Sequence, residues 1–361
     1  LQVNTINAAT SGQAVAVDIS NPRSFRNLHV NGAMQVHQRG GSITSDGYSL
    51  DMFARQTSGT GGAYTITQST TAPVGFSKSL KVDVTTADTT ITGSEYIQIK
   101  SKIEAQNLQQ LAYGTASAKN MVFSFYVRSN KTGNYSVNIK QGDSSFRQVT
   151  LQYTINSADT WERKSFSIAG DQSGNINDDT GDGFIICWGL CAGPNKTSGS
   201  LRSAWHAQVD ADQHVGMGVN ILDSTSNEWY LTGVQLEVGS YMTDFEHMSY
   251  AEDLKLCERY YQLVTNAAGG FVGNPISGSQ NYVYGNATFK TTMRANPTIV
   301  MRDDAGNTDG KVTQYGAAHD IAATAASITT NGFGYLSKGS GNFNSDVNFI
   351  IVGGYTASAE L

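Results

Sequence analysis

Apolar and polar residues alternate along several short stretches of the chain. In residues 121–128 every second side chain is apolar, as at Phe123, Phe125 and Val127. Successive side chains of a strand point to opposite faces, so this pattern predicts a strand with one buried and one solvated face, as in an antiparallel sheet. The same alternation recurs in three other stretches, residues 135–139, 149–155 and 234–238.

Residues 184–188 break this alternation because they are apolar on both faces. They predict a central strand that is covered on each side. Segments rich in Gly, Asn, Asp and Ser, at residues 129–134 and 170–183, separate the strands. Short strands with turns of this composition predict an all-β fold, and we expect a jelly-roll-like β-sandwich.

The pattern divides the chain into four parts. Residues 1–24 are polar and weakly patterned, and we expect a leader or attachment segment. Residues 25–240 are predicted to form the sandwich, and residues 241–264 a linking amphipathic helix. Residues 265–361 contain further strand-like runs and predict a smaller C-terminal β-domain.

The linking helix has a clear start signal. Ser249 can cap its first turn, and Glu252 three residues later completes a capping box. Four side chains would then form one stripe along the helix: Tyr250, Leu254, Cys257 and Tyr261. Two arrangements fit the stripe. It can pack against its own sandwich, or it can lie near the threefold axis of a trimer.

Composition narrows the function classes. Only 15% of the 361 residues are charged, and the net charge is −6 without any basic run, so we expect no nucleic-acid binding. No run of 18 apolar residues predicts a membrane helix, and residues 1–11 lack the pattern of a signal peptide. The three cysteines provide no disulfide framework and read as small buried side chains, which fits assembly in a reducing cytoplasm.

The order of several motifs resembles the fibre and receptor-binding proteins of tailed bacteriophages. Residues 233–240, GVQLEVGS, and residues 257–261, CERYY, resemble a signature of that family. Residues 27–40 resemble its N-L-x-x-N-G-x-F-x-x-x-Q-R-G entry, although Met34 stands where the pattern has Phe. Phe53 likewise stands where the family often has Trp.

The likeness extends further along the chain. Residues 123–140 and 153–162 resemble the middle strands of a carbohydrate-binding-module-type jelly roll, and residues 293–298 and 357–361 resemble the family's closing domain. The resemblance implies a homotrimeric fibre, spike or knob of a virion, assembled in the host cytoplasm. It implies an architecture and a role without assigning a binding residue.

Catalytic and metal-binding patterns are weak. The sequence has no nucleophile elbow, zinc-protease, C-x-x-C or P-loop motif, so we expect no enzyme. Carboxylate clusters such as Asp210 with Asp212 read as turn or loop residues. Asp178, Asp179 and Asp182 offer hard oxygen ligands and are a weak calcium candidate, but their spacing matches no EF-hand loop. No other cofactor is expected.

Glycan binding fits the composition better, because aromatic faces and short polar side chains are what sugars contact. Trp205 and His206 lie together in a polar stretch and are candidate glycan-binding residues, with Trp205 as a candidate for an exposed stacking side chain. Tyr282 and Tyr284 share one face of a predicted strand and are either a contact patch or packing residues, in the core or between subunits.

Three functions remain open on this sequence. The first is a virion fibre or spike protein that contacts a host-surface glycan without cleaving it. The second is a structural or decorating protein of the virion head or tail with no ligand of its own. The third is a glycan depolymerase, which would need a pair of carboxylates across the scissile bond.

Overall fold

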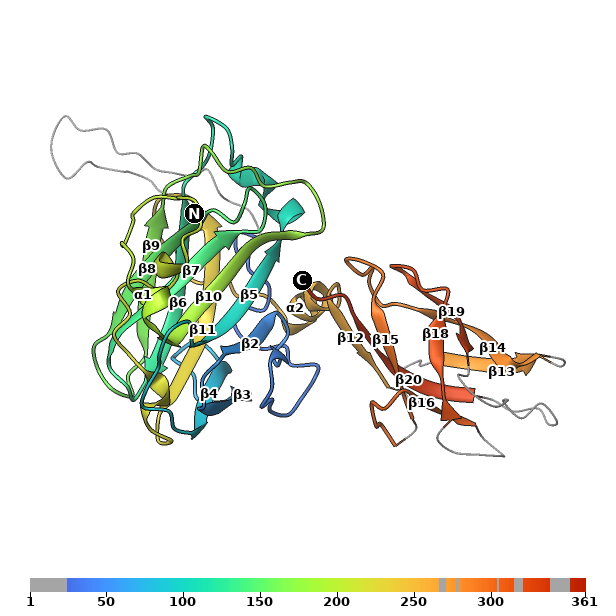
Figure 1. Ribbon diagram of the computed structural model, residues 1–361. Helices are drawn as coiled ribbons and strands as arrows, with labels where there is room; N and C mark the ends of the chain where they lie inside the picture. Colours follow the sequence, from blue (N-terminus) through green and yellow to red (C-terminus); the bar gives the residue numbers. More distant parts are fainter. Residues whose placement is uncertain (1–24, 266–270, 277–278, 304, 315–320, 338–350) are drawn as a thin grey trace.

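Two β-units, joined end to end, form the structure in Figure 1, a computed structural model. It describes residues 25–265, 271–276, 279–303, 305–314, 321–337 and 351–361. The predicted leader, residues 1–24, lies outside the described residues. Strands dominate both units, which confirms the all-β prediction. No helix among the described residues is long and apolar enough to cross a membrane.

The larger unit is a sandwich of two antiparallel sheets, as predicted. In the continuous stretch 25–265 the first sheet has six strands, in the order β1 (Gly47–Tyr48), β2 (Phe53–Ser58), β5 (Tyr96–Glu104), β10 (Asp182–Ala192), β7 (Gly133–Gln141) and β8 (Gln148–Ile155). The second sheet has five, in the order β3 (Ala63–Ser69), β4 (Ser79–Thr86), β11 (Glu228–Val238), β6 (Met121–Ser129) and β9 (Glu162–Ile168).

The predicted strands of the sandwich are all present. The alternation of apolar and polar residues determines which face of each strand is buried. Trp188 of β10 lies at the centre of the core, fully buried between the sheets. Its ring centroid is 5.9 Å from that of Phe123 and 6.1 Å from those of Phe53 and Phe125. Strands from both sheets therefore meet at this indole, and aromatic contacts of this kind stabilise the core beyond simple area burial.

Short helical turns cross the ends and the outer side of the sandwich. They are η1 (Ala105–Leu111), α1 (Pro194–Thr197), η2 (Asp210–Asp212) and η3 (Ile221–Asp223). The segment that contains α1 and η2 runs beside the outer face of the six-stranded sheet, where the backbone of His206 pairs with Gln148 of β8.

The smaller unit has its own core and sheet. Among its described residues the path of the sheet is β17 (Ile321–Ala322), β16 (Lys311–Gln314), β20 (Ile351–Ser358), β13 (Phe271–Ile276), β14 (Ser279–Thr288), β19 (Gly332–Ser337) and β18 (Thr324–Ala326). Two further strands, β12 (Tyr261–Val264) and β15 (Thr298–Arg302), pair with β20. Phe289, Phe333 and Tyr355 pack together in the core of this unit.

The linking helix is shorter than predicted. The capping box of Ser249 and Glu252 is present, but the helix, α2, covers only Tyr250–Cys257. Tyr261 belongs to β12 and Tyr250 is 53% exposed, so the predicted four-residue stripe is wrong. Leu254 and Cys257 contact the core of the sandwich, which is the first of the two arrangements left open by the sequence.

A buried carboxylate joins the two units. Glu104, at the end of β5, is fully buried and accepts hydrogen bonds from Arg259 Nη2 at 2.6 Å and Nε at 2.8 Å. The hydroxyl of Tyr260 donates to the same carboxylate at 2.9 Å. A bidentate guanidinium pair of this kind fixes orientation as well as adding energy, so it holds β12 and the smaller unit against the sandwich.

Arg39 makes a second connection at the same junction. Its guanidinium lies 3.7 Å from the ring centroid of Tyr261 and 2.5 Å from the carboxylate of Glu360. Gln38 donates to the backbone oxygen of Tyr261 at 2.7 Å. The residues that resemble the phage entry motif, the CERYY signature and the closing segment therefore meet in space.

The junction can be tested by replacing its carboxylate. Glu104→Gln leaves the part-buried Arg259 without its charge partner, and breaking such a pair should destabilise the fold by about 2–3 kcal/mol. We expect the melting temperature to fall by roughly 5–10 °C. Asp244→Asn, which removes an exposed ion pair with Arg163, is the control and should shift it by about 1 °C or less. Equal shifts for the two variants would contradict this account of the junction.

Asp253 of α2 generates a pH-dependent prediction. It is buried, its Oδ1 accepts the backbone N–H of Asn31 at 2.9 Å, and burial raises the pKa of its carboxyl to about 6. A pKa higher in the folded state means that stability is greatest below the unfolded value and is lost as the pH rises through about 6.

Asp253→Asn should remove that loss, because an amide keeps the acceptor without the charge. We expect a free energy of unfolding about 1–2 kcal/mol above wild type at pH 8, with the gain shrinking towards pH 4. Denaturant titrations of both proteins at the two pH values measure it, and other titrating groups cancel in the comparison. A difference that does not change with pH would refute the role given to Asp253.

Candidate functional site

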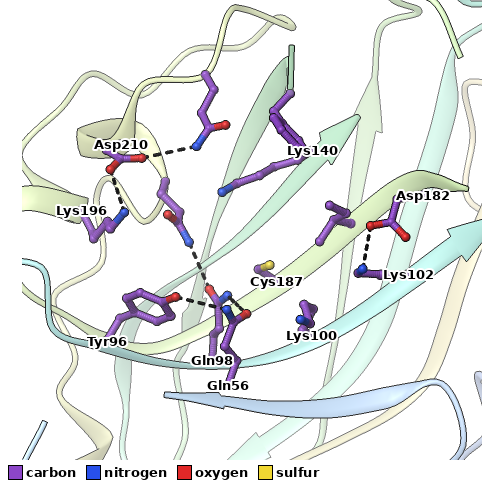
Figure 2. A pocket seen from close by; sticks show the side chains of 14 residues that line it. Gln56, Tyr96, Gln98, Lys100, Lys102, Lys140, Asp182, Cys187, Lys196 and Asp210 are labelled. Atoms are coloured by element: carbon purple, nitrogen blue, oxygen red, sulfur yellow. Dashed lines mark hydrogen bonds and ion pairs between the residues drawn. The ribbon is translucent and has the colours of Figure 1, made fainter. Parts of the chain in front are cut away.

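A groove of about 450 Å³ lies on the outer face of the six-stranded sheet. Figure 2 shows its side chains converging from β2, β5, β7 and β10, with α1 and the η2 segment closing one side. Alternation explains why they point there. Ile97, Ile99 and Ile103 of β5 face the core, which leaves the intervening positions of the strand for the groove.

Amide side chains on the floor of the groove form one hydrogen-bonded network. Gln98 Nε2 donates to Gln56 Oε1 at 2.8 Å, and Gln56 Nε2 donates to the hydroxyl of Tyr96 at 3.2 Å. Gln213, from the η2 segment, donates to Gln98 Oε1 at 3.2 Å. These contacts hold three amides and a phenol in fixed positions. Gln98 and Gln213, 2% and 4% exposed, support the floor from below, whereas the half-buried side chains of Gln56 and Tyr96 reach the open groove.

His214 supports this network from behind. It is fully buried, and its Nε2 lies 2.9 Å from Gln98 Oε1 while its Nδ1 lies 3.0 Å from Ser136 Oγ. Burial, with a smaller effect from Lys140 and Lys196, lowers the pKa of His214 to about 3. The imidazole is therefore neutral at physiological pH and serves as a hydrogen-bonding support for Gln98.

The groove also carries ionic side chains. Lys102 Nζ lies 2.6 Å from Asp182 Oδ2, and Lys196 Nζ lies 3.0 Å from Asp210 Oδ2. Lys100 and Lys140 line the groove as well, and the exposed ring of Phe146 adds a second aromatic group to that of Tyr96.

The carboxylates of the groove are poorly suited to acid catalysis. The hydrogen bond from Lys196 lowers the pKa of Asp210, whereas a general acid needs a raised pKa at neutral pH. Asp182 is engaged by Lys102. This arrangement can bind polar groups through amides, hydroxyls and charges.

Trp205, a candidate for an exposed stacking residue, is buried, so that hypothesis is wrong. It is 7% exposed, its ring stacks on Phe184 at a centroid distance of 5.6 Å, and its Nε1 donates to the backbone of Ala169. Its polar neighbours in sequence lie in a loop folded over an apolar patch of the sandwich. His206 Nδ1 lies 2.8 Å from the backbone oxygen of Ala207, and the side chain is largely covered.

Tyr282 and Tyr284 are on the surface of the smaller unit, 38% and 51% exposed, so packing within the core is excluded for them. Both rings contact Tyr335 of the neighbouring strand β19, at centroid distances of 5.7 and 5.5 Å. The three tyrosines form an exposed aromatic patch on β14 and β19, separate from the groove.

The calcium candidate does not come together. In the part of the chain that the structure describes, no three His, Cys, Asp or Glu side chains are grouped to hold a metal ion. Asp182 faces Lys102 in the groove, and Asp179 accepts the backbone N–H of Gly181 within its own turn. Asp178 lies in that turn too, on the exposed side. Local turn geometry explains Asp179 without a metal.

Sequence reasoning missed most of the groove. A signal was present at residues 96–102, where Tyr, Gln, Lys and Lys alternate with apolar or small residues. Such a strand has a wet face able to bind a ligand, but the pattern alone does not distinguish it from an ordinary solvated face. Gln56, Lys140 and Gln213 come from distant parts of the chain and meet only in the fold.

Comparisons with known proteins found resemblance at the level of structure only. No protein-family model and no curated protein sequence matches the chain. Among solved structures, the enzymatically active domain of bacteriophage CBA120 tailspike protein 4 matches with 10% identity and a TM-score of 0.32, over 59% of this chain and 22% of that one.

Carbohydrate-binding modules also match. The family 11 module of the cellulosomal cellulase Lic26A-Cel5E of Clostridium thermocellum has 10% identity and a TM-score of 0.29, over 56% of this chain and 97% of the module. The xylan-binding domain from CBM 22 has 11% identity and a TM-score of 0.30, over 54% and 92%. At such identities and TM-scores, the function proposed below does not depend on these matches.

Proposed function

We propose that this chain is a phage virion fibre or spike protein that binds a host-surface glycan in the groove without cleaving it. The observation that carries the proposal is the fixed amide network of Gln56, Gln98 and Gln213 on the floor of an open groove. The resemblance of the motifs around the junction to phage fibre proteins supplies the virion role.

The chemistry of the groove suits a sugar. The half-buried amide of Gln56 presents both a donor and an acceptor to hydroxyl groups, and the rings of Tyr96 and Phe146 offer apolar faces for the C–H side of a sugar ring. The network fixes the amides before a ligand arrives, so less conformational entropy is lost on binding. The groove is open along the sheet, which admits a chain as well as a terminal sugar.

A non-catalytic role is supported by the state of the acidic residues. Cleavage of a glycosidic bond requires two carboxylates with separate roles, one of them protonated. In the groove both aspartates are held by lysines, and the pKa of Asp210 is lowered. This favours binding over hydrolysis.

The second candidate is a structural or decorating virion protein. The patch of Tyr282, Tyr284 and Tyr335 favours a contact with a second copy or with another virion protein, because exposed aromatic clusters are typical of interfaces. A homotrimer that uses this patch would leave the groove of each chain free, so the two roles are compatible.

Glycan binding is tested with an array of purified bacterial surface polysaccharides. Tyr96→Ala removes an aromatic face and one partner of Gln56, and we expect about tenfold weaker binding, equivalent to 1.4 kcal/mol. Tyr241→Ala, at a residue 82% exposed and outside the groove, is the matched control and should bind as wild type. Loss of binding in both variants, or in neither, would contradict the groove as the site.

The same array tests catalysis. A binding protein releases no reducing ends from any polysaccharide that it retains, and we expect none. Release of reducing ends that disappears in Asp182→Asn or Asp210→Asn would establish a depolymerase in place of a binding protein. Binding to virions but to no polysaccharide would favour the structural alternative.

Assembly is tested by light scattering on the purified chain. We expect a mass three times that of one chain, because trimeric fibres cover exposed strand edges and patches that a monomer leaves open. The double variant Tyr282→Ser with Tyr284→Ser should give monomers if the patch is the interface, while Tyr241→Ser should not. A monomeric wild-type chain would overturn the trimer.

A further inference from the structure

The groove is positively charged although the chain is acidic. Four lysines and two aspartates line it, which leaves an excess of two positive charges, whereas the whole chain carries −6. A local charge of the opposite sign to the molecule attracts anionic ligands to that spot while the rest of the surface repels extended polyanions.

Strand register brings three of these lysines to one place. Lys100 of β5 lies opposite Cys187 of β10, and Lys102 lies opposite Ile185 of the same strand. Lys140 of β7 lies opposite Ile185 from the other side. Lys140 and Lys102 therefore lie directly across β10 from each other, whereas Lys100 is offset from Lys140 by two residues along the strand, so the backbones of Lys100 and Lys140 are about 12 Å apart.

Cys187 lies among these lysines in the sheet, because Lys100 is opposite it and both Lys102 and Lys140 are opposite Ile185, two residues away on β10. Burial raises the pKa of its thiol. The thiol is neutral at physiological pH and contributes no negative charge to offset them.

Two of the four lysines have no acidic partner. Lys102 is neutralised by Asp182 and Lys196 by Asp210. Among the described residues, Lys100 and Lys140 form no ion pair and no side-chain hydrogen bond, and in Figure 2 no dashed line joins either of them to another of the residues drawn. Burial is the largest effect on the pKa of Lys140 and lowers it, and the charge of Lys196 acts in the same direction against opposing effects of Cys187 and Asp210, so the ammonium is held in a site that disfavours it. An anionic group placed between Lys100 and Lys140 would relieve that cost.

We propose that the groove selects an acidic glycan, whose sugar residues carry carboxylate or phosphate groups, and that Lys100 and Lys140 receive the anionic group. This inference rests on the proposed glycan-binding function and names its ligand class. The half-buried side chains of Gln56 and Tyr96, held in place by Gln98 and Gln213, then contact the neutral hydroxyls of the same chain, so charge and hydroxyl pattern are recognised together.

A saccharide fits this arrangement better than a nucleic acid does. Nucleic-acid binding relies on a broad basic footprint along the phosphate backbone. Here the unpaired positive charge is confined to two side chains and lies among amides, within an acidic molecule. The arrangement suits a ligand with spaced negative charges and many hydroxyls.

The test uses purified polysaccharides that contain uronic acids, phosphate or only neutral sugars. For each acidic polysaccharide that binds, the same polymer is measured after carboxyl reduction or dephosphorylation, which shows which anion is recognised. We expect neutralisation of the polymer to weaken binding at least tenfold, and we expect the affinity for the native polymer to fall as NaCl is raised.

The double variant Lys100→Gln with Lys140→Gln should lose at least tenfold in affinity for the native polymer and become insensitive to its neutralisation. Lys255→Gln, which removes an exposed lysine of α2 outside the groove, is the matched control and should behave as wild type. Circular dichroism melting shows whether the double variant folds. If the double variant does not fold, the comparison of native and neutralised polymer on the wild-type protein still decides whether the groove selects the anionic group.

The outcomes separate this inference from the function on which it rests. Tyr96-dependent binding of neutral polysaccharides, insensitive to salt and to the lysine variant, would overturn the acidic ligand and leave glycan binding intact. Binding of no polysaccharide would overturn both. Equally tight binding of inorganic polyphosphate or a DNA oligonucleotide would show a general anion site and would overturn the inference.

Discussion

The burial of Trp188 between the two sheets is the contact on which the rest of the structure depends. Its indole contacts aromatic rings from both sheets. These contacts determine which face of β10 packs against the core. Because β5 and β7 pair with β10 in fixed antiparallel registers, the orientation of β10 also determines which of their side chains face the core. A shift of one residue in any of these registers would exchange core and groove side chains. The groove is therefore the outward consequence of how the core is packed.

The motifs that resemble phage fibre proteins have structural explanations in this fold. The side-chain amide of Asn27 donates to Val234 and its oxygen accepts from Leu236, which ties the entry segment to β11. A Cβ at Gly32 would lie 2.1 Å from the backbone oxygen of Val234, so no larger residue fits there. Arg39 and Arg259 join the two units. These motifs describe an architecture, and of their charged residues only Lys140, at the end of the stretch 123–140, lines the groove.

The sequence predicted the fold well where one rule decided the outcome. Period-two stretches became strands, and the Ser249 and Glu252 pattern became a capped helix, because both depend on neighbours in sequence. The helix end was wrong because Tyr260 and Tyr261 are held by Glu104 and Arg39, partners more than 150 residues away. The exposure hypothesised for Trp205 was wrong for a similar reason, because Phe184 and Ala169, which are not its neighbours in sequence, cover its ring.

The groove itself could not be assembled from sequence. Its ionic and amide residues come from β2, β5, β7, β10, α1 and the loop around η2, and each is unremarkable within its own stretch. Only the sheet order, which places β10 between β5 and β7, reveals that Lys100 and Lys140 share a face. The tyrosine pair was easier, because Tyr282 and Tyr284 are two apart on one strand and alternation alone puts them together.

The most direct test of the central claim is a crystal structure of the chain with an oligosaccharide prepared from a polysaccharide that it retains. The account predicts that the sugar lies across β5, β10 and β7, within hydrogen-bonding distance of Gln56 and against the ring of Tyr96. A sugar seated instead on the Tyr282, Tyr284 and Tyr335 patch, with the groove empty, would contradict it.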